Sequence, residues 1–217
     1  MEPPVAATLT TAAGIGLHLA SPTIAYVVGR SARIRKRISP EHAYDLFTTI
    51  GAALCLFALL ELSIFPVGQI LTFGLLFGLM AGAVAPLALW RAYGKTPTIR
   101  RPTPRTISLA LLALCAVAEE IIWRVTVVHL VHNGLDAPYW IAIVVSIAGF
   151  AALHLGLHGA RSVPYFVGFG ALAVCLTIFL GVGAAIGFHL AHNLVIALVH
   201  PKPRDSYVRP VASEVKW

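Results

Sequence analysis

Hydrophobic residues occupy most of the chain in long runs, separated by short breaks rich in glycine, proline or charge. A helix needs about 20 apolar residues to cross a bilayer, and seven runs approach or reach that length. The predicted spans cover residues 5–29, 44–66, 67–90, 107–131, 138–157, 165–181 and 183–199. We expect a tight turn at 65–68 and a hinge at Gly181-Val182-Gly183. The pattern therefore predicts an all-α, polytopic transmembrane helix bundle.

Composition strengthens this interpretation. Of 217 residues, 58% are hydrophobic and 12% are charged, with a mean hydropathy of +0.83, whereas soluble domains carry about 25% charged residues. A soluble core cannot absorb so much apolar surface in so short a chain, so the bilayer is the expected solvent. We interpret 1–217 as a single membrane domain, with a motif-bearing core at 107–200 and a cytoplasmic tail at 200–217.

Basic residues are distributed unevenly between the predicted loops. Fifteen of the 16 lysines and arginines lie in residues 30–43, 91–106 and 158–164 or after residue 199, and the other is Arg124. These four segments share one side of the membrane if the spans alternate. Cytoplasmic loops are enriched in lysine and arginine, so we predict an external N-terminus and a cytoplasmic C-terminus in the cell membrane. Each cluster of basic residues directly adjoins a predicted span. The net charge of +7 is therefore expected to interact with membrane lipids rather than with nucleic acid.

Two adjacent glutamates interrupt the fourth predicted span. A charged side chain near the bilayer centre costs ~3 kcal/mol on insertion scales, and such residues are functional by default. Glu120 and Arg124 are four positions apart and share a helix face. Glu119 points about 100° around the helix from Glu120. Packing in lipid does not require this arrangement, so these residues are the first candidates for an active site.

Two later spans add polar pairs at the same spacing. Phe150 and His154 share a face of the fifth span, and His189 and Asn193 share a face of the seventh. At 1.5 Å per residue, Glu119 lies roughly 18 Å from the cytoplasmic end of its helix, His189 roughly 16 Å and His154 roughly 6 Å. We expect three helices to present these side chains to one water-filled cavity that opens to the cytoplasm.

The residue types in this set suggest hydrolysis by activated water. A carboxylate beside an imidazole can remove a proton from water. A second imidazole and a carboxamide can donate hydrogen bonds to a developing oxyanion. A serine or cysteine nucleophile is less convincing, because Ser146 has no acid beside it and Cys115 has no base on its helix face. The set is therefore typical of amide hydrolysis without a covalent intermediate.

Three motifs, in order on separate spans, resemble a known family. They are Glu-Glu-x-x-x-Arg at 119–124, Phe-x-x-x-His at 150–154 and His-x-x-x-Asn at 189–193. Together they are similar to the motifs of the CPBP family of intramembrane glutamate proteases. That family includes the type II CAAX prenyl endopeptidases and abortive-infection-type bacterial membrane proteins. The resemblance covers residues 107–200.

The resemblance implies a role for each motif residue. Glu119 and His154 would activate water, and His189 and Asn193 would stabilise the oxyanion. The resemblance assigns supporting roles to Glu120 and Arg124, and Phe150 is expected to shape the pocket. The implied substrate is a peptide or protein, lipid-modified or embedded in the membrane. No cofactor and no metal is expected.

Two other classes of function stay open at this stage. A metal-dependent membrane hydrolase could use the two glutamates with His154, His158, His189 and His192 as ligands, although the chain has no His-Glu-x-x-His motif. A non-enzymatic transporter or scaffold could use the intramembrane acids to relay protons or dock a helix. A transporter would more naturally show duplicated, interrupted helices, which the sequence does not display.

Overall fold

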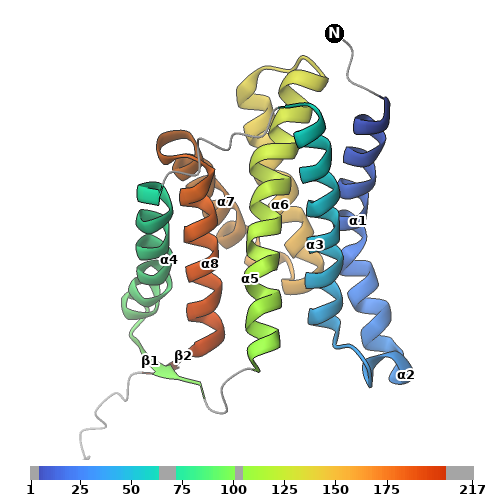
Figure 1. Ribbon diagram of the computed structural model, residues 1–217. Coiled ribbons are helices and arrows are strands. Elements are labelled where there is room, and N and C mark those ends of the chain that lie inside the picture. Colours follow the sequence, from blue (N-terminus) through green and yellow to red (C-terminus); the bar gives the residue numbers. More distant parts are fainter. Residues whose placement is uncertain (1–4, 64–71, 101–104, 204–217) are drawn as a thin grey trace, which may run out of the picture.

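The computed structural model describes residues 5–63, 72–100 and 105–203, which form a helical bundle (Figure 1). The long helices are α1 (Val5–Arg30), α3 (Pro40–Glu61), α4 (Thr72–Ala92), α5 (Thr106–Glu120), α6 (Tyr139–His158), α7 (Val163–Leu180) and α8 (Val182–Leu198), and α2 (Ala32–Arg35) is short. In these ranges, six helices, counting α5 with its continuation to Gly134, are long and apolar enough to cross a membrane, and α8 is a shorter apolar one. This arrangement confirms the predicted all-α membrane bundle.

The helix ends mostly follow the predicted spans, with one clear difference. The second span was expected from residue 44, but α3 begins at Pro40 after Ser39, whose side chain accepts a hydrogen bond from the His42 backbone at 3.2 Å. Serine at the cap and proline at the first position begin a helix although its first turn is polar. The predicted turn at 65–68, and the tail beyond residue 203, lie outside the described residues.

Single glycines separate the last three helices. Gly159 ends α6 with a φ of 79° and precedes the short 3-10 turn η4 (Ala160–Ser162). Gly181, with a φ of 85°, is the only residue between α7 and α8. Glycine takes these positive φ values without steric cost. Of the hinge predicted at 181–183, only Gly181 lies between the two helices, because Val182 and Gly183 already belong to α8.

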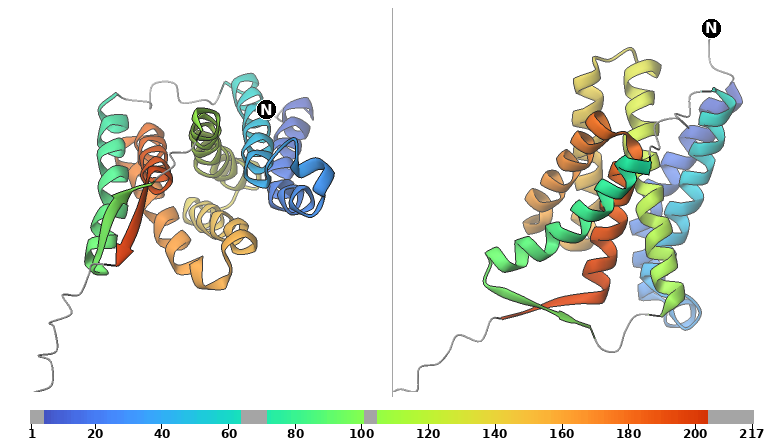
Figure 2. Two further views of the ribbon diagram at one scale, coloured as in Figure 1. Left: turned by 90° about the horizontal axis from the view of Figure 1, so that it is seen from below. Right: turned by 60° about the vertical axis from the view of Figure 1, so that its left-hand side comes forward.

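Helix α5 lies at the centre of the bundle. Seen from below, the α1–α3 pair lies on one side of it, the α4–α8 pair on the opposite side, and α6 with α7 along a third side (Figure 2). Past Glu120 the same helix continues through two π-helical segments, η2 (Ile121–Val127) and η3 (Leu130–Gly134). Every neighbouring pair can therefore direct side chains toward the middle of α5 and η2.

Glycines bring the outer pairs into close contact. A Cβ at Gly14 of α1 would lie 2.6 Å from the Gly51 carbonyl oxygen of α3. On α4, Gly74, Gly78 and Gly82 repeat every four residues. A Cβ at Gly78 or Gly82 would collide with the α8 backbone, and one at Gly74 with the carbonyl of Leu180 at the end of α7. Small residues at this spacing let membrane helices pack backbone to backbone. The position of α8 is thus set by α4.

A two-stranded antiparallel ribbon joins the ends of α4 and α8. It consists of β1 (Lys95–Ile99) and β2 (Val199–Pro203), with pairs from Lys95↔Pro203 to Ile99↔Val199. The sequence analysis did not predict it, because both strands are short and contain proline. The ribbon lies across the end of the bundle where α1 ends and α5 begins (Figure 1).

Candidate active site

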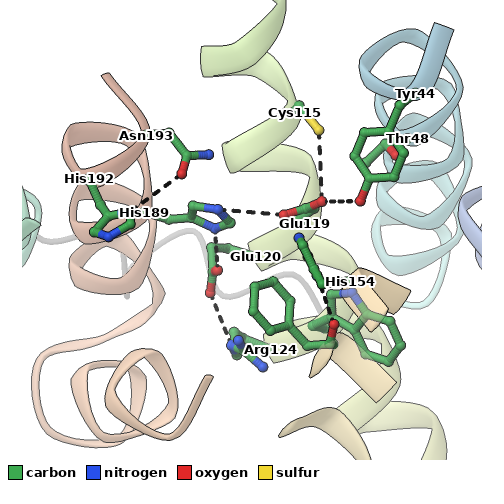
Figure 3. A network of polar contacts seen from close by, with 12 residues as sticks. Tyr44, Thr48, Cys115, Glu119, Glu120, Arg124, His154, His189, His192 and Asn193 are labelled. Carbon is green, nitrogen blue, oxygen red and sulfur yellow. Dashed lines mark hydrogen bonds and ion pairs between the residues drawn. The ribbon is translucent and has the colours of Figure 1, made fainter. Parts of the chain in front are cut away.

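Glu119 is held between three helices. Its side chain comes from the last turn of α5, and the residue is only 3% exposed. Carboxylate Oε1 accepts a 2.5 Å hydrogen bond from the Tyr44 hydroxyl of α3 and lies 3.9 Å from Cys115 Sγ. Carboxylate Oε2 faces His189 Nε2 of α8 at 3.5 Å (Figure 3). One oxygen is therefore fixed by Tyr44, and the other faces the His189 imidazole.

Glu120 links the central helix to α8 and to Arg124. Its residue is fully buried, with Oε1 2.7 Å from His189 Nδ1 and Oε2 3.1 Å from Arg124 Nε. The predicted pairing of Glu120 with Arg124 at i, i+4 is present. His189 consequently lies between two carboxylates, one on each ring nitrogen.

Arg124 connects this pair to α6. Its Nη1 donates to Ser146 Oγ at 2.8 Å, and Ser146 donates to the Trp123 carbonyl at 2.7 Å. The guanidinium carbon lies 5.1 Å from the centre of the Phe150 ring. Phe150, predicted to shape the pocket, contributes a buried ring that packs against the guanidinium and His189. Ser146 is thus a structural partner of the arginine rather than a neighbour of Glu119.

The helix changes its hydrogen bonding directly after the two glutamates. The π-helical segment η2 begins at Ile121, and Thr126 Oγ1 bonds back to the Ile121 carbonyl five residues earlier at 3.1 Å. π-Helical turns are rare and are frequent at functional sites. Their presence here could not be read from hydrophobic periodicity, and they set the direction of Trp123 and Arg124.

His154 reaches the same region from α6. Its Nδ1 lies 2.8 Å from the Phe150 carbonyl, and its ring stacks on Phe166 with centroids 4.2 Å apart. The ring points toward Glu119 (Figure 3). From the sequence, His154 was expected to lie nearer the cytoplasmic end of its helix than Glu119 does. The two residues nevertheless meet, because the turn between α6 and α7 lies nearer the middle of the bundle than the end of α1 or the start of α5 (Figure 1). His154 and Glu119 are therefore at one level.

Asn193 lies one turn from His189 but is held by another group. Its Oδ1 is 3.5 Å from His192 Nδ1, and His192 Nε2 is 2.6 Å from the Tyr165 hydroxyl of α7. Within the described contacts, Asn193 makes no hydrogen bond to Glu119 or Glu120. The structure brings the other motif residues into one cluster and leaves Asn193 at its edge (Figure 3).

Sequence reasoning missed Tyr44, the residue that contacts Glu119 from α3. No motif marks it, and only its i, i+4 spacing from Thr48 on a mostly apolar helix hinted at a polar inward face. Thr48 belongs to a second buried set, in which Trp123 Nε1 donates to His18 Nε2 at 3.0 Å and His18 Nδ1 lies 3.1 Å from Thr48 Oγ1. Because indole nitrogen only donates, the His18 tautomer is fixed. These contacts tie α1 and α3 to η2.

The cluster lacks the geometry of a metal site in the part of the chain that the structure describes. There, no three histidine, cysteine, aspartate or glutamate side chains are arranged to hold an ion. The four histidines considered as ligands are dispersed, with His192 bonded to Tyr165 and His154 to the Phe150 carbonyl.

The fold and the buried cluster define a multi-pass membrane protein with two carboxylates and several imidazoles in its centre. Comparison with known families narrows the class of this membrane protein. Residues 101–195 match the family described as Type II CAAX prenyl endopeptidase Rce1-like, so the chain carries an Rce1-like domain of the intramembrane CAAX-type protease class. This confirms the family predicted from the motifs. No curated protein and no solved structure matches the chain significantly.

Proposed function

We propose that this protein is an intramembrane glutamate endopeptidase in which Glu119 and His154 activate a water molecule. The observation that carries the proposal is the placement of the Glu119 carboxylate. Tyr44 occupies one oxygen, while the other oxygen faces the His189 imidazole of α8, and the His154 ring points toward the same carboxylate (Figure 3). A buried carboxylate in this position has the geometry of a general base.

His154 is suited to hold the water that Glu119 deprotonates. A carbonyl oxygen can only accept, so the contact with Phe150 makes Nδ1 the donor and leaves Nε2 of the neutral ring as an acceptor. Water would donate one hydrogen to Nε2 and the other to Glu119. As its oxygen attacks the substrate carbonyl carbon, the proton passes to Glu119, which then returns it to the leaving amine when the C–N bond breaks.

His189 would stabilise the oxyanion that this attack forms. Its Nδ1 contacts Glu120, and its Nε2 faces Glu119. The Nε2 edge of the ring would hydrogen-bond the oxygen of the reacting carbonyl, where preorganised donors contribute most. Arg124 and Glu120 hold this ring in place rather than touch the substrate.

Asn193 would supply a second donor to the oxyanion. His192 Nδ1–H donating to Asn193 Oδ1, with Tyr165 donating to His192 Nε2, forms a consistent chain of donors and acceptors. This chain turns the Asn193 amide so that its NH₂ group is free to donate. A modest side-chain movement on substrate binding would bring it to the carbonyl.

The proposed substrate is a peptide or protein cleaved close to its lipid-modified or membrane-embedded segment. The catalytic cluster lies within the spans, and the Rce1-like domain supports action on protein substrates in membranes. We propose that substrate enters from the cytoplasmic side, toward which the basic ends of α1, α4 and α5 would face.

Protein termini in expressing membranes test this function. Membranes carrying the wild type, Glu119→Ala or Glu61→Ala are compared by mass spectrometry of protein ends. Glu61 is an exposed glutamate at the far end of α3 and serves as the matched control. New termini should appear with the wild type and with Glu61→Ala but not with Glu119→Ala. Identical termini in all three membranes would contradict the proposal.

A further inference from the structure

The β1–β2 ribbon has two chemically different faces. Side chains alternate along a strand, and directly paired residues share a face. The register therefore puts Thr96 and Thr98 with Lys202 and His200 on one face. The opposite face carries Pro97, Ile99, Val199 and Pro201, with Lys95 at its end. The ribbon is amphipathic.

Its place in the fold puts the ribbon at the membrane boundary. β1 begins three residues after α4 ends, and β2 follows α8 without a break, so both strands continue from membrane spans. The ribbon lies across the end of α8 rather than along it (Figure 2). Its outer strand edges need water as a hydrogen-bond partner, which excludes the hydrocarbon core. The apolar face is nevertheless only partly covered, with Ile99 69% exposed and Pro97, Val199 and Pro201 half-buried.

A cavity beside the ribbon collects positive charge. It has a volume of about 610 Å³ and is lined by Arg91, Gly94, Lys95, Thr96 and Pro97. Both basic residues are exposed, and neither forms an ion pair with any residue that the structure describes. The size suits a small ligand, since ligand pockets span roughly 300–1,000 Å³. The lining favours an anion with oxygen acceptors.

We propose that this cavity binds the phosphate headgroup of an anionic phospholipid. The planar guanidinium of Arg91 carries a fork of N–H donors, and it would donate hydrogen bonds to two phosphate oxygens. Lys95, exposed at the end of the apolar face of the ribbon, would add a second positive charge. The apolar face of the ribbon, with Ile99 and nearby Tyr93, would pack on the upper acyl chain of the same lipid. A free phosphate ion has no acyl chain and would leave this apolar face exposed to water.

Occupation of the cavity would stabilise the α4–α8 pair. Arg91 belongs to α4, and the ribbon ties its end to the strand that extends α8. A ligand that binds only the folded arrangement stabilises it by mass action. The effect can be measured without any assay of peptidase activity, so it stands or falls separately from the proposed function.

The test compares two double variants of the full-length protein in neutral detergent. Arg91→Gln with Lys95→Gln removes the charge of the cavity. Lys36→Gln with Arg37→Gln removes the same charge from exposed residues beyond α2, at the same end of the bundle. Thermal unfolding is followed while phosphatidylglycerol, phosphatidylcholine or inorganic phosphate is added, and retained lipid is counted by native mass spectrometry.

Phosphatidylglycerol should raise the Tm of the wild type and of the Lys36/Arg37 variant, and phosphatidylcholine should not. Because each basic residue at a membrane surface contributes about 1 kcal/mol, loss of both should weaken the apparent affinity of the Arg91/Lys95 variant for phosphatidylglycerol roughly 30-fold. Equal responses of the two double variants would overturn the site. A matching Tm increase with inorganic phosphate alone would overturn its assignment to a lipid.

Discussion

At the scale of single residues, the carboxylate of Glu119, the proposed general base, has a hydrogen-bond partner from outside the Rce1-like segment. Tyr44 lies in α3, whereas the family match begins at residue 101. Its hydroxyl fixes Glu119 Oε1, which leaves Oε2 in one orientation. We infer that Tyr44 is a positioning residue that lowers the number of carboxylate rotamers available before water is deprotonated.

Replacing Tyr44 with phenylalanine should therefore impair turnover more than binding. A hydrogen bond to a charged group contributes about 1.5–3 kcal/mol, so kcat should fall at least about tenfold while KM changes little. The control is Tyr26→Phe, which removes the hydroxyl of a tyrosine that is 65% exposed on α1. Steady-state peptidase kinetics measure both. An unchanged kcat in Tyr44→Phe would contradict a role of the Tyr44 hydroxyl in positioning Glu119.

The ion pair of Glu120 and Arg124 should act on stability. Removing one partner of a buried pair leaves an uncompensated charge and costs about 3–5 kcal/mol. Arg124→Met should therefore lower the Tm in detergent markedly. Arg124→Met combined with Glu120→Gln should recover much of the loss, because the introduced amide is neutral and retains a carbonyl for His189. If the Tm of the double variant is no higher than that of Arg124→Met, loss of the ion pair is not the cause of the destabilisation.

At the scale of elements, the position of α8 beside α5 follows from its close contact with α4. A methyl group at Gly78 has no room against the α8 backbone, whereas one at Gly16 of α1 meets no atom within 4 Å. Gly78→Ala should destabilise the protein by about 1–3 kcal/mol, as overpacking does. Gly16→Ala should be neutral or stabilising, since alanine favours a helix over glycine. Thermal unfolding of the two variants distinguishes these outcomes, and equal Tm values would contradict backbone-to-backbone packing.

The length of the apolar runs predicted the helices, because a membrane span is apolar along its whole length whether a residue faces lipid or a neighbouring helix. The same reasoning found Glu119, Glu120, Arg124, His154 and His189, since charge within a span is conspicuous. It could not find contacts that depend on packing between spans. Tyr44 looks like an ordinary aromatic residue until α3 is placed beside α5. The π-helical turns and the proline-containing ribbon also arise from tertiary contacts rather than from local pattern.

At the scale of the whole molecule, charge asymmetry predicts how the bundle sits in the membrane. The basic ends of α1 and α4 and the start of α5 lie at one end of the bundle, together with the ribbon (Figure 1). A reporter fused after Trp217 should be active only if it works in the cytoplasm. One inserted at Gly134, in the turn before α6, should be active only outside. A tail that reports outside would reverse the orientation and move the catalytic access to the opposite face.

The most direct measurement of the central claim is kcat of the purified Glu119→Gln variant. Glutamine keeps the shape of the side chain but cannot accept the proton of water, and general-base catalysis contributes about 10²–10⁴-fold. We expect kcat to fall by that factor, with Glu61→Gln retaining wild-type turnover and Tm values unchanged in both. The assay is run on a lipid-modified peptide after exhaustive chelation, so that metal dependence is read in the same experiment. Wild-type turnover by Glu119→Gln, or loss of activity on chelation that returns only with a metal, would contradict a glutamate-activated water.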